Sequence, residues 1–285
     1  MESSIPTIRK SYKGSFPFKL ATTSYIYPAP LVPNVIKLAP LLDEIEIVFY
    51  ESKGQDAFPD ERLIEDLKGL SLKADVRFNI HLPIDVYLGD PCAALRSEGV
   101  KVVKEWIERT MPLSPSVYTL HFSLRDDQQA LDPVLWRHHL SESAGEILTC
   151  GIEPSRLSIE TLGYPYEWIE DIVRTFGFSI CLDIGHLLLR GVDLKDYLER
   201  YLSVTSIVHL HGVQNSRDHL GIDRLTAETL DLVFSYLQSY QGILSIEVFT
   251  WEDLRNSLQV LDERWKLTWE DETVKRRIGK TTRLT

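Results

Sequence analysis

Eight short apolar runs alternate along the chain with stretches of helical pattern, and this alternation limits the folds open to it. The runs are rich in Val, Ile, Leu and Phe, which is typical of strands in a parallel sheet covered on both faces. Eight such units, each followed by a helix, match the count of a (β/α)8 TIM barrel. The predicted strands cover residues 18–24, 45–50, 76–82, 117–122, 157–161, 179–183, 206–211 and 244–248.

Several stretches between the runs carry clear helix signals. Residues 59–70 begin with acidic side chains, and residues 98–111 space their apolar residues three and four apart. The helix predicted over 165–177 ends at Gly177, and Thr226 is the expected N-cap of the helix that follows it near the C-terminus. A doubly wound open sheet is the alternative, but no Gly-rich phosphate-binding pattern follows the first run. We therefore predict an α/β fold with a single TIM barrel.

Length and composition fit one domain with short extensions. The 285 residues are 44% hydrophobic and 26% charged, as in ordinary soluble globular proteins. We assign residues 16–266 to the barrel and residues 1–15 to an N-terminal extension. Residues 267–285 are basic and show little apolar periodicity, which favours a mobile C-terminal tail.

Charge and the lack of long apolar runs narrow the classes of partner. The net charge is −11, which disfavours a broad basic face for nucleic acid. No apolar run has the length of a signal peptide or of a membrane span of about 20 residues, so we expect a cytoplasmic protein without a membrane partner. The cysteines are too few and too scattered for a disulfide framework, and we expect them to be reduced and mostly buried. They are Cys92, Cys150 and Cys181.

Six predicted strands end in a side chain that can hold a metal. In a parallel barrel these ends converge on one mouth, where the active sites of such barrels lie. A single buried His or Glu is as readily explained by a structural hydrogen bond or ion pair, but six strands of eight ending alike indicate one shared site. Imidazole and carboxylate ligands together suit zinc, manganese, cobalt or iron. The strand-end residues are His81, His121, Glu160, Asp183, His211 and Glu247.

Two local motifs refine this site. Asp183 begins an Asp-x-x-His step that ends at His186, so a carboxylate and an imidazole from one turn can address the same volume. His209 and His211 lie two apart on one strand and point to the same side. We favour His211 as the ligand because it is nearer the mouth, and we expect His209 to be a satisfied interior histidine or a support for its neighbour. The loop after this strand supplies Arg217, Asp218 and His219.

Four residues near the predicted mouth are candidates for contacts with a substrate. Tyr25 and Tyr27 follow the first strand and are placed to wall a pocket for a flat ligand. Arg125 follows the fourth strand and is placed to meet a phosphate, and Arg217 lies in the seventh loop. For each of them, the role of an ordinary loop residue is the alternative.

The ordered strand-end motifs resemble the metal-site signatures of the xylose isomerase-like barrels, specifically the apurinic endonuclease family 2 branch. The motifs are HLP, LHF, SIET, LDIGH, HLHG, DHLGI and IEV, and they run from the third to the eighth predicted strand. This resemblance implies two or three divalent metals, zinc or manganese, in the mouth of the barrel. The family pattern has Asp-x-His in the seventh loop, whereas Asp218 directly precedes His219 here, so Asp218 is not carried over as a ligand. The implied ligands are His81, His121, Glu160, Asp183, His186, His211, His219 and Glu247.

The chain as a whole, including FPFKLATTSYIYP and RDHLGI, is similar to the bacterial cobamide-remodelling enzymes, which cut the phosphoester link in the nucleotide loop of these vitamin B12-type corrinoids. This similarity implies a hydrolase of a small corrinoid substrate, with Glu160, Asp183 and Glu247 as catalytic residues.

Three other functions remain open at this point. A sugar isomerase or epimerase would hold one metal and use two glutamates to exchange protons with a ketose. An apurinic-site endonuclease is disfavoured by the net charge. A corrinoid carrier without hydrolytic chemistry is disfavoured because its Asp-x-His-x-x-Gly signature does not occur in the chain.

Overall fold

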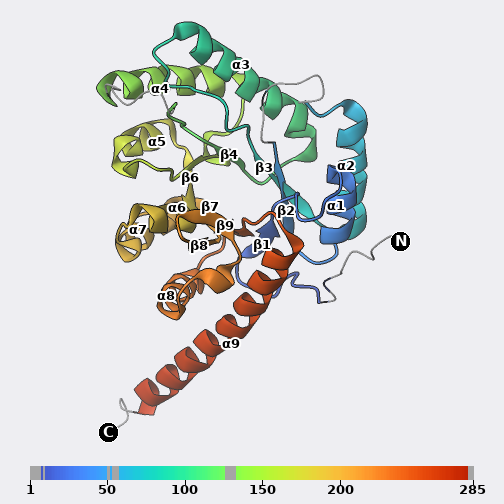
Figure 1. Ribbon diagram of the computed structural model, residues 1–285, viewed down its shortest axis with the longest axis vertical. Helices are drawn as coiled ribbons and strands as arrows, with labels where there is room; N and C mark the ends of the chain where they lie inside the picture. Colours follow the sequence, from blue (N-terminus) through green and yellow to red (C-terminus); the bar gives the residue numbers. More distant parts are fainter. Residues whose placement is uncertain (1–7, 9, 50–51, 53–57, 126–132, 282–285) are drawn as a thin grey trace.

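The computed structural model of the chain describes residues 8, 10–49, 52, 58–125 and 133–281, with side chains described up to residue 267. Eight parallel strands form one sheet in the order β1-β10-β7-β6-β5-β4-β3-β2, as predicted for a TIM barrel (Figure 1). The strands are β1 (Lys19–Thr22), β2 (Glu44–Val48), β3 (Arg77–His81), β4 (Tyr118–Leu120), β5 (Leu157–Glu160), β6 (Ser179–Asp183), β7 (Thr205–Leu210) and β10 (Ile243–Ile246). Residue 50, at the end of the second predicted strand, lies outside the described residues.

The two edge strands of this sheet, β1 and β2, meet and nearly close the barrel. The backbone N–H of Ser24 donates to the carbonyl of Glu46 at 2.8 Å, and Thr23 forms a parallel bridge with the same residue. The carboxyl ends of the barrel strands therefore form one mouth, the geometry that the strand-end motifs require.

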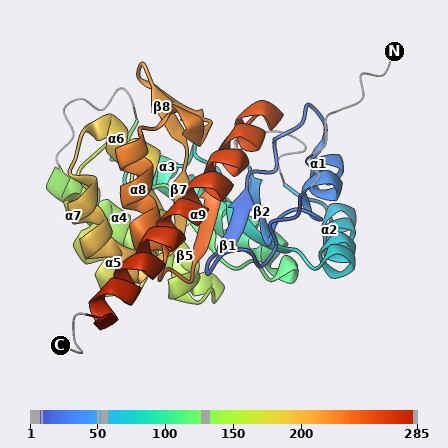
Figure 2. The ribbon, with the colours of Figure 1, turned by 90° about the horizontal axis from the view of Figure 1, so that it is seen from below.

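Helices surround the barrel, and their ends follow the sequence signals (Figures 1 and 2). Thr226 is the N-cap of α8, where its hydroxyl accepts from the N–H of Thr229 at 3.2 Å. Gly177 ends α5 with a φ of 73°, a conformation that glycine adopts without a Cβ penalty. The helices are α1 (Leu31–Leu38), α2 (Glu61–Ala74), α3 (Ala93–Thr110), α4 (Pro133–Ile147), α5 (Glu170–Phe176), α6 (Ile184–Arg190), α7 (Leu194–Tyr201), α8 (Ala227–Leu237) and α9 (Trp251–Thr281). Short 3₁₀ turns occur at Met111–Leu113, Leu148–Cys150, Pro154–Arg156, Tyr166–Trp168, Leu202–Val204 and Ile222–Arg224.

The seventh loop holds a small antiparallel hairpin that the sequence reasoning did not anticipate. It consists of β8 (Gly212–Gln214) and β9 (Arg217–Leu220), and it stands out from the barrel in Figure 2. Asn215 and Ser216 form its two-residue turn with φ of 52° and 60°. Two positive φ values match the type I′ turn, whose twist suits a hairpin. The hairpin carries His219 back toward the mouth.

The last helix, α9, runs from Trp251 to Thr281 and extends well beyond the barrel in Figure 1. Its backbone therefore continues through most of the range 267–285 that was expected to be a separate tail. Residues 282–285 lie outside the described residues, as do residues 1–7 and 9 of the expected N-terminal extension. The mobility of the tail stays a prediction.

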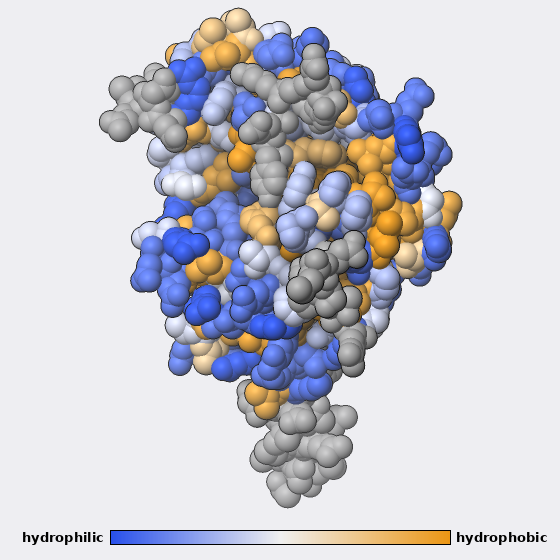
Figure 3. Space-filling model, turned by 45° about the vertical axis from the view of Figure 1, so that its right-hand side comes forward, coloured by the Kyte–Doolittle hydropathy of each residue, from blue (hydrophilic) through white to orange (hydrophobic). Residues whose placement is uncertain are grey.

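A layer of small and apolar side chains fills the barrel below the polar mouth. This layer packs as a cluster of its own, made of Ala21, Val117, Cys181, Ile207 and Ile243. All three cysteines are free thiols in the structure, but Cys181 alone is buried, so the expectation that most of them are buried was wrong. None of the helices in the described part of the chain is long and apolar enough to cross a membrane. Figure 3 shows a face on which hydrophilic and hydrophobic residues are interspersed.

Candidate metal centre

All eight predicted ligands lie inside the mouth of the barrel and form three adjacent groups with one further histidine, His209. The inner group consists of Glu160, Asp183, His209 and Glu247, all buried, and the paired-histidine group consists of His81, His121 and Glu160. The three-histidine group consists of His186, His211 and His219. Within each group the potential ligand atoms lie within 4.8 Å of one another. The first two groups share Glu160.

His209 takes the place in the inner group that the sequence reasoning gave to His211. The His209 Nδ1 atom lies 3.1 Å from Glu247 Oε2, 3.6 Å from Glu160 Oε1 and 3.8 Å from Asp183 Oδ2. His211 follows the last residue of β7 and contacts the group from its edge, with Nε2 3.2 Å from Asp183 Oδ1. The structure therefore separates the two histidines: His209 lies among the carboxylates of the inner group, and His211, the ligand favoured from the sequence, lies in the group with His186 and His219.

The paired-histidine group is held in place by hydrogen bonds on both sides. His121 Nε2 lies 2.6 Å from Glu160 Oε2, and His81 Nε2 lies 3.3 Å from the same oxygen. The Nδ1–H of His81 donates to the carbonyl of Leu82 at 3.0 Å. That bond fixes the ring so that Nε2 faces the carboxylate.

The three-histidine group depends on the hairpin. The backbone N–H of His219 donates to His211 Nδ1 at 3.0 Å, and the two rings stack with centroids 4.3 Å apart. Asp218 Oδ1 lies 3.1 Å from His219 Nδ1, while His219 Nε2 lies 3.5 Å from Glu247 Oε2. Asp218 thus orients His219 rather than joining the group. His219 adopts a φ of 53°, a left-handed conformation that is uncommon for a residue other than glycine.

The DIGH motif has a structural explanation at each position. Asp183 is the last residue of β6 and the N-cap of α6, where its Oδ1 accepts from the backbone N–H of His186 at 2.7 Å. The carboxylate and the imidazole are therefore brought together by the first turn of the helix. A Cβ atom on Gly185 would lie 1.9 Å from His211 Cε1, so glycine leaves the room that the imidazole occupies.

Imidazoles shift the pKa values of two buried glutamates in the mouth, and carboxylates shift those of several histidines. Burial raises the pKa of Glu160, but the charges of His121 and His209 outweigh it and hold that pKa well below its usual range. The pKa of Glu247 is held low in the same way, chiefly by His209. Burial lowers the pKa of His219, but its partner Glu247 outweighs this effect and the pKa rises to about 9. Without a cation, protonated histidines therefore compensate the buried carboxylates.

The donor atoms fit a bound divalent metal. The buried atoms His209 Nδ1 and Glu247 Oε2 have no hydrogen-bond partner among the described residues, although they lie 3.1 Å apart. Two ligands that bind one zinc ion tetrahedrally at about 2.0–2.2 Å each lie about 3.3–3.6 Å from one another, slightly farther apart than this pair. Imidazole nitrogens with carboxylate oxygens are ligands for zinc, manganese, cobalt and iron. The chemistry of the pair and its lack of hydrogen-bond partners therefore fit a bound metal.

The four candidate substrate residues differ in their placement. Tyr25 is 38% exposed, whereas only 4% of Tyr27 is exposed and its ring packs against the core under the Lys37 amino group. Tyr27 therefore has little surface to offer a ligand. Arg125 lines a small cavity beyond β3 and β4, and Arg217 is exposed at the start of β9. A substrate role for Tyr25, Arg125 and Arg217 stays a prediction.

Glu46 is a buried residue of this region that the sequence reasoning missed. It lies in β2 with 0% exposure, and its Oε1 is 3.0 Å from His209 Nε2. Its other oxygen accepts from the Ser245 hydroxyl at 2.5 Å. The available signal was a pair of glutamates alternating with apolar residues in a run that otherwise looks fully buried, EIEIV.

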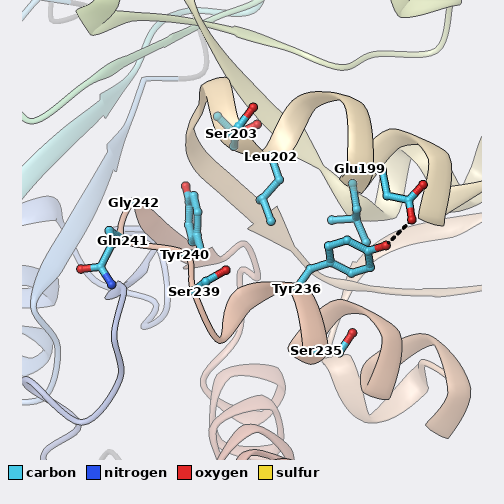
Figure 4. Close-up of a pocket in the computed structure, with 11 residues that line it drawn as sticks. Glu199, Leu202, Ser203, Ser235, Tyr236, Ser239, Tyr240, Gln241 and Gly242 are labelled. Atoms are coloured by element: carbon cyan, nitrogen blue, oxygen red, sulfur yellow. Dashed lines mark hydrogen bonds between the residues drawn. The ribbon is translucent and has the colours of Figure 1, made fainter.

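A larger cavity lies at the opposite end of the barrel from this centre. Its volume is about 690 Å³, and it is lined by residues of α7, α8 and the segments that lead into β7 and β10 (Figure 4). Tyr236 donates to Glu199 at 2.9 Å across it. Because the active sites of such barrels lie at the carboxyl ends of the strands, this cavity is not a candidate for the catalytic site.

Known proteins share this fold across most of the chain. A D-tagatose 3-epimerase-like protein superposes with a TM-score of 0.72 at 20% identity, covering 89% of this chain and 99% of the other. For endonuclease IV from Thermus thermophilus the TM-score is 0.64 at 19% identity, with the same coverage. An L-ribulose 3-epimerase gives 0.69 at 13% identity, covering 90% and 97%.

The sequence comparisons give a family but no individual relative. No curated protein matches the chain. The family model described as "Xylose isomerase-like TIM barrel" matches residues 42–264. This match includes every residue of the three metal-ligating groups. The chain therefore belongs to the xylose isomerase-like TIM barrel family.

Proposed function

We propose that the protein is a metal-dependent hydrolase that cuts a phosphoester. The observation that carries this proposal is that, among the described residues, the mouth holds five groups of potential metal ligands, four of them overlapping, which include the inner, paired-histidine and three-histidine groups. Sites with two or more metals suit phosphoester hydrolysis because charge must be offset on both the attacking and the leaving oxygen. A proton-transfer reaction on a sugar has no evident need for the paired-histidine and three-histidine groups.

The three groups and the two glutamates would have different roles in hydrolysis. The inner group would hold one metal, and the paired-histidine and three-histidine groups would hold the others. Bound divalent metals supply a hydroxide at neutral pH and stabilise developing negative charge. Glu160 lies between the inner and paired-histidine groups, with oxygens 2.6 Å from His121 and 3.6 Å from His209, and is placed to orient the attacking water. Glu247 contacts both His209 and His219 and would orient these two imidazoles.

For the substrate, we propose the nucleotide loop of a cobamide. The whole-chain similarity to cobamide-remodelling enzymes, including residues 16–28 and 217–222, supports this choice. The net charge of −11 agrees with a small phosphodiester, because a nucleic-acid duplex is bound through many basic contacts. Endonuclease IV shares the fold, but the negative net charge disfavours nucleic acid as the substrate of this chain.

A sugar epimerase is the second candidate, and the inner group favours it. Glu160 and Glu247 both lie close to the Nδ1 atom of His209, at 3.6 and 3.1 Å, so the inner group holds two glutamates that could exchange protons with a ketose. Five of the solved structures with this fold are described as epimerases or epimerase-like.

One set of incubations separates these functions. Purified protein is given a cobamide, a ketose or abasic DNA, with and without a chelator, and products are identified by mass spectrometry. We expect release of the lower-ligand nucleoside or its phosphate from the cobamide, and its loss on chelation. Ketose turnover without cobamide cleavage would contradict the proposal, as would full cobamide cleavage in a metal-free sample. Glu44→Gln is a matched control, because Glu44 is a buried carboxylate of β2 outside the three groups.

A further inference from the structure

Glu46 and His209 form a buried pair beneath the mouth. Both side chains have 0% exposure, and Glu46 Oε1 lies 3.0 Å from His209 Nε2. A buried carboxylate is costly unless it is paired, so a glutamate in the interior of β2 requires an explanation beyond packing.

The two nitrogens of His209 face different partners. Nε2 faces Glu46, whereas Nδ1 faces the three carboxylates of the inner group, Glu247 at 3.1 Å, Glu160 at 3.6 Å and Asp183 at 3.8 Å. A histidine that binds a metal through one nitrogen commonly donates the other N–H to a carboxylate, which fixes its tautomer and ring orientation. Glu46 occupies the position of that carboxylate.

The barrel holds Glu46 in this position from the side of β10. Ser245 pairs with His209 in the register of β10 and β7, and its hydroxyl donates to Glu46 Oε2 at 2.5 Å. Within the described part of the chain, Glu46 Oε1 and His209 Nε2 have no other hydrogen-bond partner, and their contact is not well directed as a hydrogen bond. A small rotation of the ring would aim Nε2–H at Oε1 and satisfy both buried atoms.

We propose that Glu46 is a positioning residue for the inner group: it accepts the Nε2–H of His209 and thereby presents Nδ1 to the metal. This inference rests on the proposed metal dependence. The competing role is direct ligation, since Glu46, His81 and His209 also have ligand atoms within 4.8 Å of one another. Positioning is favoured because Oε2 is engaged by Ser245 and because Nδ1, not Nε2, faces the other carboxylates of the inner group.

The test measures zinc binding and the histidine tautomer in the full chain. Zinc affinity and stoichiometry are determined by competition with a chromogenic chelator for the wild type and for Glu46→Ala, Glu46→Gln and Ser245→Ala. Glu44→Gln is the control, two residues away on the same strand and equally buried. Two-bond ¹H–¹⁵N spectra of the zinc-loaded wild type identify which His209 nitrogen binds the metal.

We expect Glu46→Ala to weaken one zinc site by about 10–100-fold without changing the number of sites. Glu46→Gln keeps an acceptor oxygen for Nε2–H and should stay close to the wild type, and Ser245→Ala should lose less than Glu46→Ala. His209 should bind zinc through Nδ1. Metal bound through Nε2, or unchanged affinity in Glu46→Ala, would overturn the inference while leaving metal dependence intact. Loss of one whole site in both Glu46 variants would identify Glu46 as a ligand instead. A wild type that binds no zinc would overturn the proposed function as well. If Glu46→Ala does not fold, Ser245→Ala and the wild-type spectra still decide the question.

Discussion

Glu160→Gln is the substitution that the metal centre should tolerate least. Glu160 is the last residue of β5, is 1% exposed and belongs to two of the three metal-ligating groups. Its carboxylate lies within 3.6 Å of four imidazole nitrogens, those of His81, His121, His186 and His209. The amide keeps the size and one acceptor oxygen but removes the charge that all four imidazoles share.

The expected loss of stability follows from the burial of these carboxylate–imidazole pairs. Removing one member of a buried ion pair costs about 3–5 kcal/mol. Because the amide still accepts from His121, we expect the lower end of that range in the metal-free protein. At about 2–4 °C per kcal/mol for a chain of roughly this size, the melting temperature should fall by about 6–12 °C. Hydrolysis should fall by about 10²–10⁴-fold, the usual contribution of a group that directs proton transfer.

Three measurements test these effects: thermal melts in chelator and in excess metal, metal analysis, and cobamide cleavage. The control is Glu44→Gln, at a buried carboxylate of β2 outside the three groups, where an amide oxygen can still accept from the Ser116 hydroxyl. We expect the control to bind metal and cleave substrate as the wild type does. A Glu160→Gln protein with unchanged metal content and activity would refute the assignment of Glu160 as the shared ligand.

Three further predictions concern the histidines. His209→Asn should remove a metal from the inner group and abolish cleavage, whereas His211→Asn should disturb the three-histidine group and leave the inner metal in place. Metal analysis at graded zinc concentrations checks this. Loss of the inner metal in His211→Asn, and not in His209→Asn, would restore His211 to the inner group. Gly185→Ala should displace the His211 ring, because its Cβ would lie 1.9 Å from His211 Cε1, and should cost about 1–3 kcal/mol in chemical unfolding; a variant as stable as the wild type would contradict the close fit. His219 has a pKa of about 9 in the fold against about 6.5 when unfolded, so its contribution is fully present below about pH 6.5 and is lost as the pH rises through 9. Melts of the metal-free protein should therefore show lower stability at pH 9.5 than at pH 6.5. Zinc affinity should rise over the same range, because protons compete with the metal. Stability that increases with pH in chelator would contradict the ion pairs of His219.

The sequence was sufficient to predict the barrel and to bring the candidate ligands to one mouth, because both depend on local patterns. Apolar runs bounded by turn residues predicted the eight strands, and ligand-type residues at their ends predicted a common mouth. Asp183 and His186 come together through a strand end and the first turn of a helix, which spacing alone predicts.

Other features depend on contacts between strands inside the barrel, which the spacing of residues along the sequence does not show. His209 and His211 lie two apart in the sequence but belong to different groups, because the carboxylates that they contact come from other strands. Glu46 joins the site through contacts with residues about 160 to 200 positions away, so only the closing of the barrel reveals its role. The hairpin was missed because its turn, Asn215-Ser216, lacks the glycine that usually marks a type I′ turn.

The number of metals bound by each chain tests the central claim most directly. Elemental analysis of the purified protein, after loading with zinc or manganese and removal of free metal, should give two or three ions per chain, and cobamide cleavage should follow their occupancy. A single ion per chain, together with turnover of a ketose, would contradict the account and favour an epimerase on the same barrel.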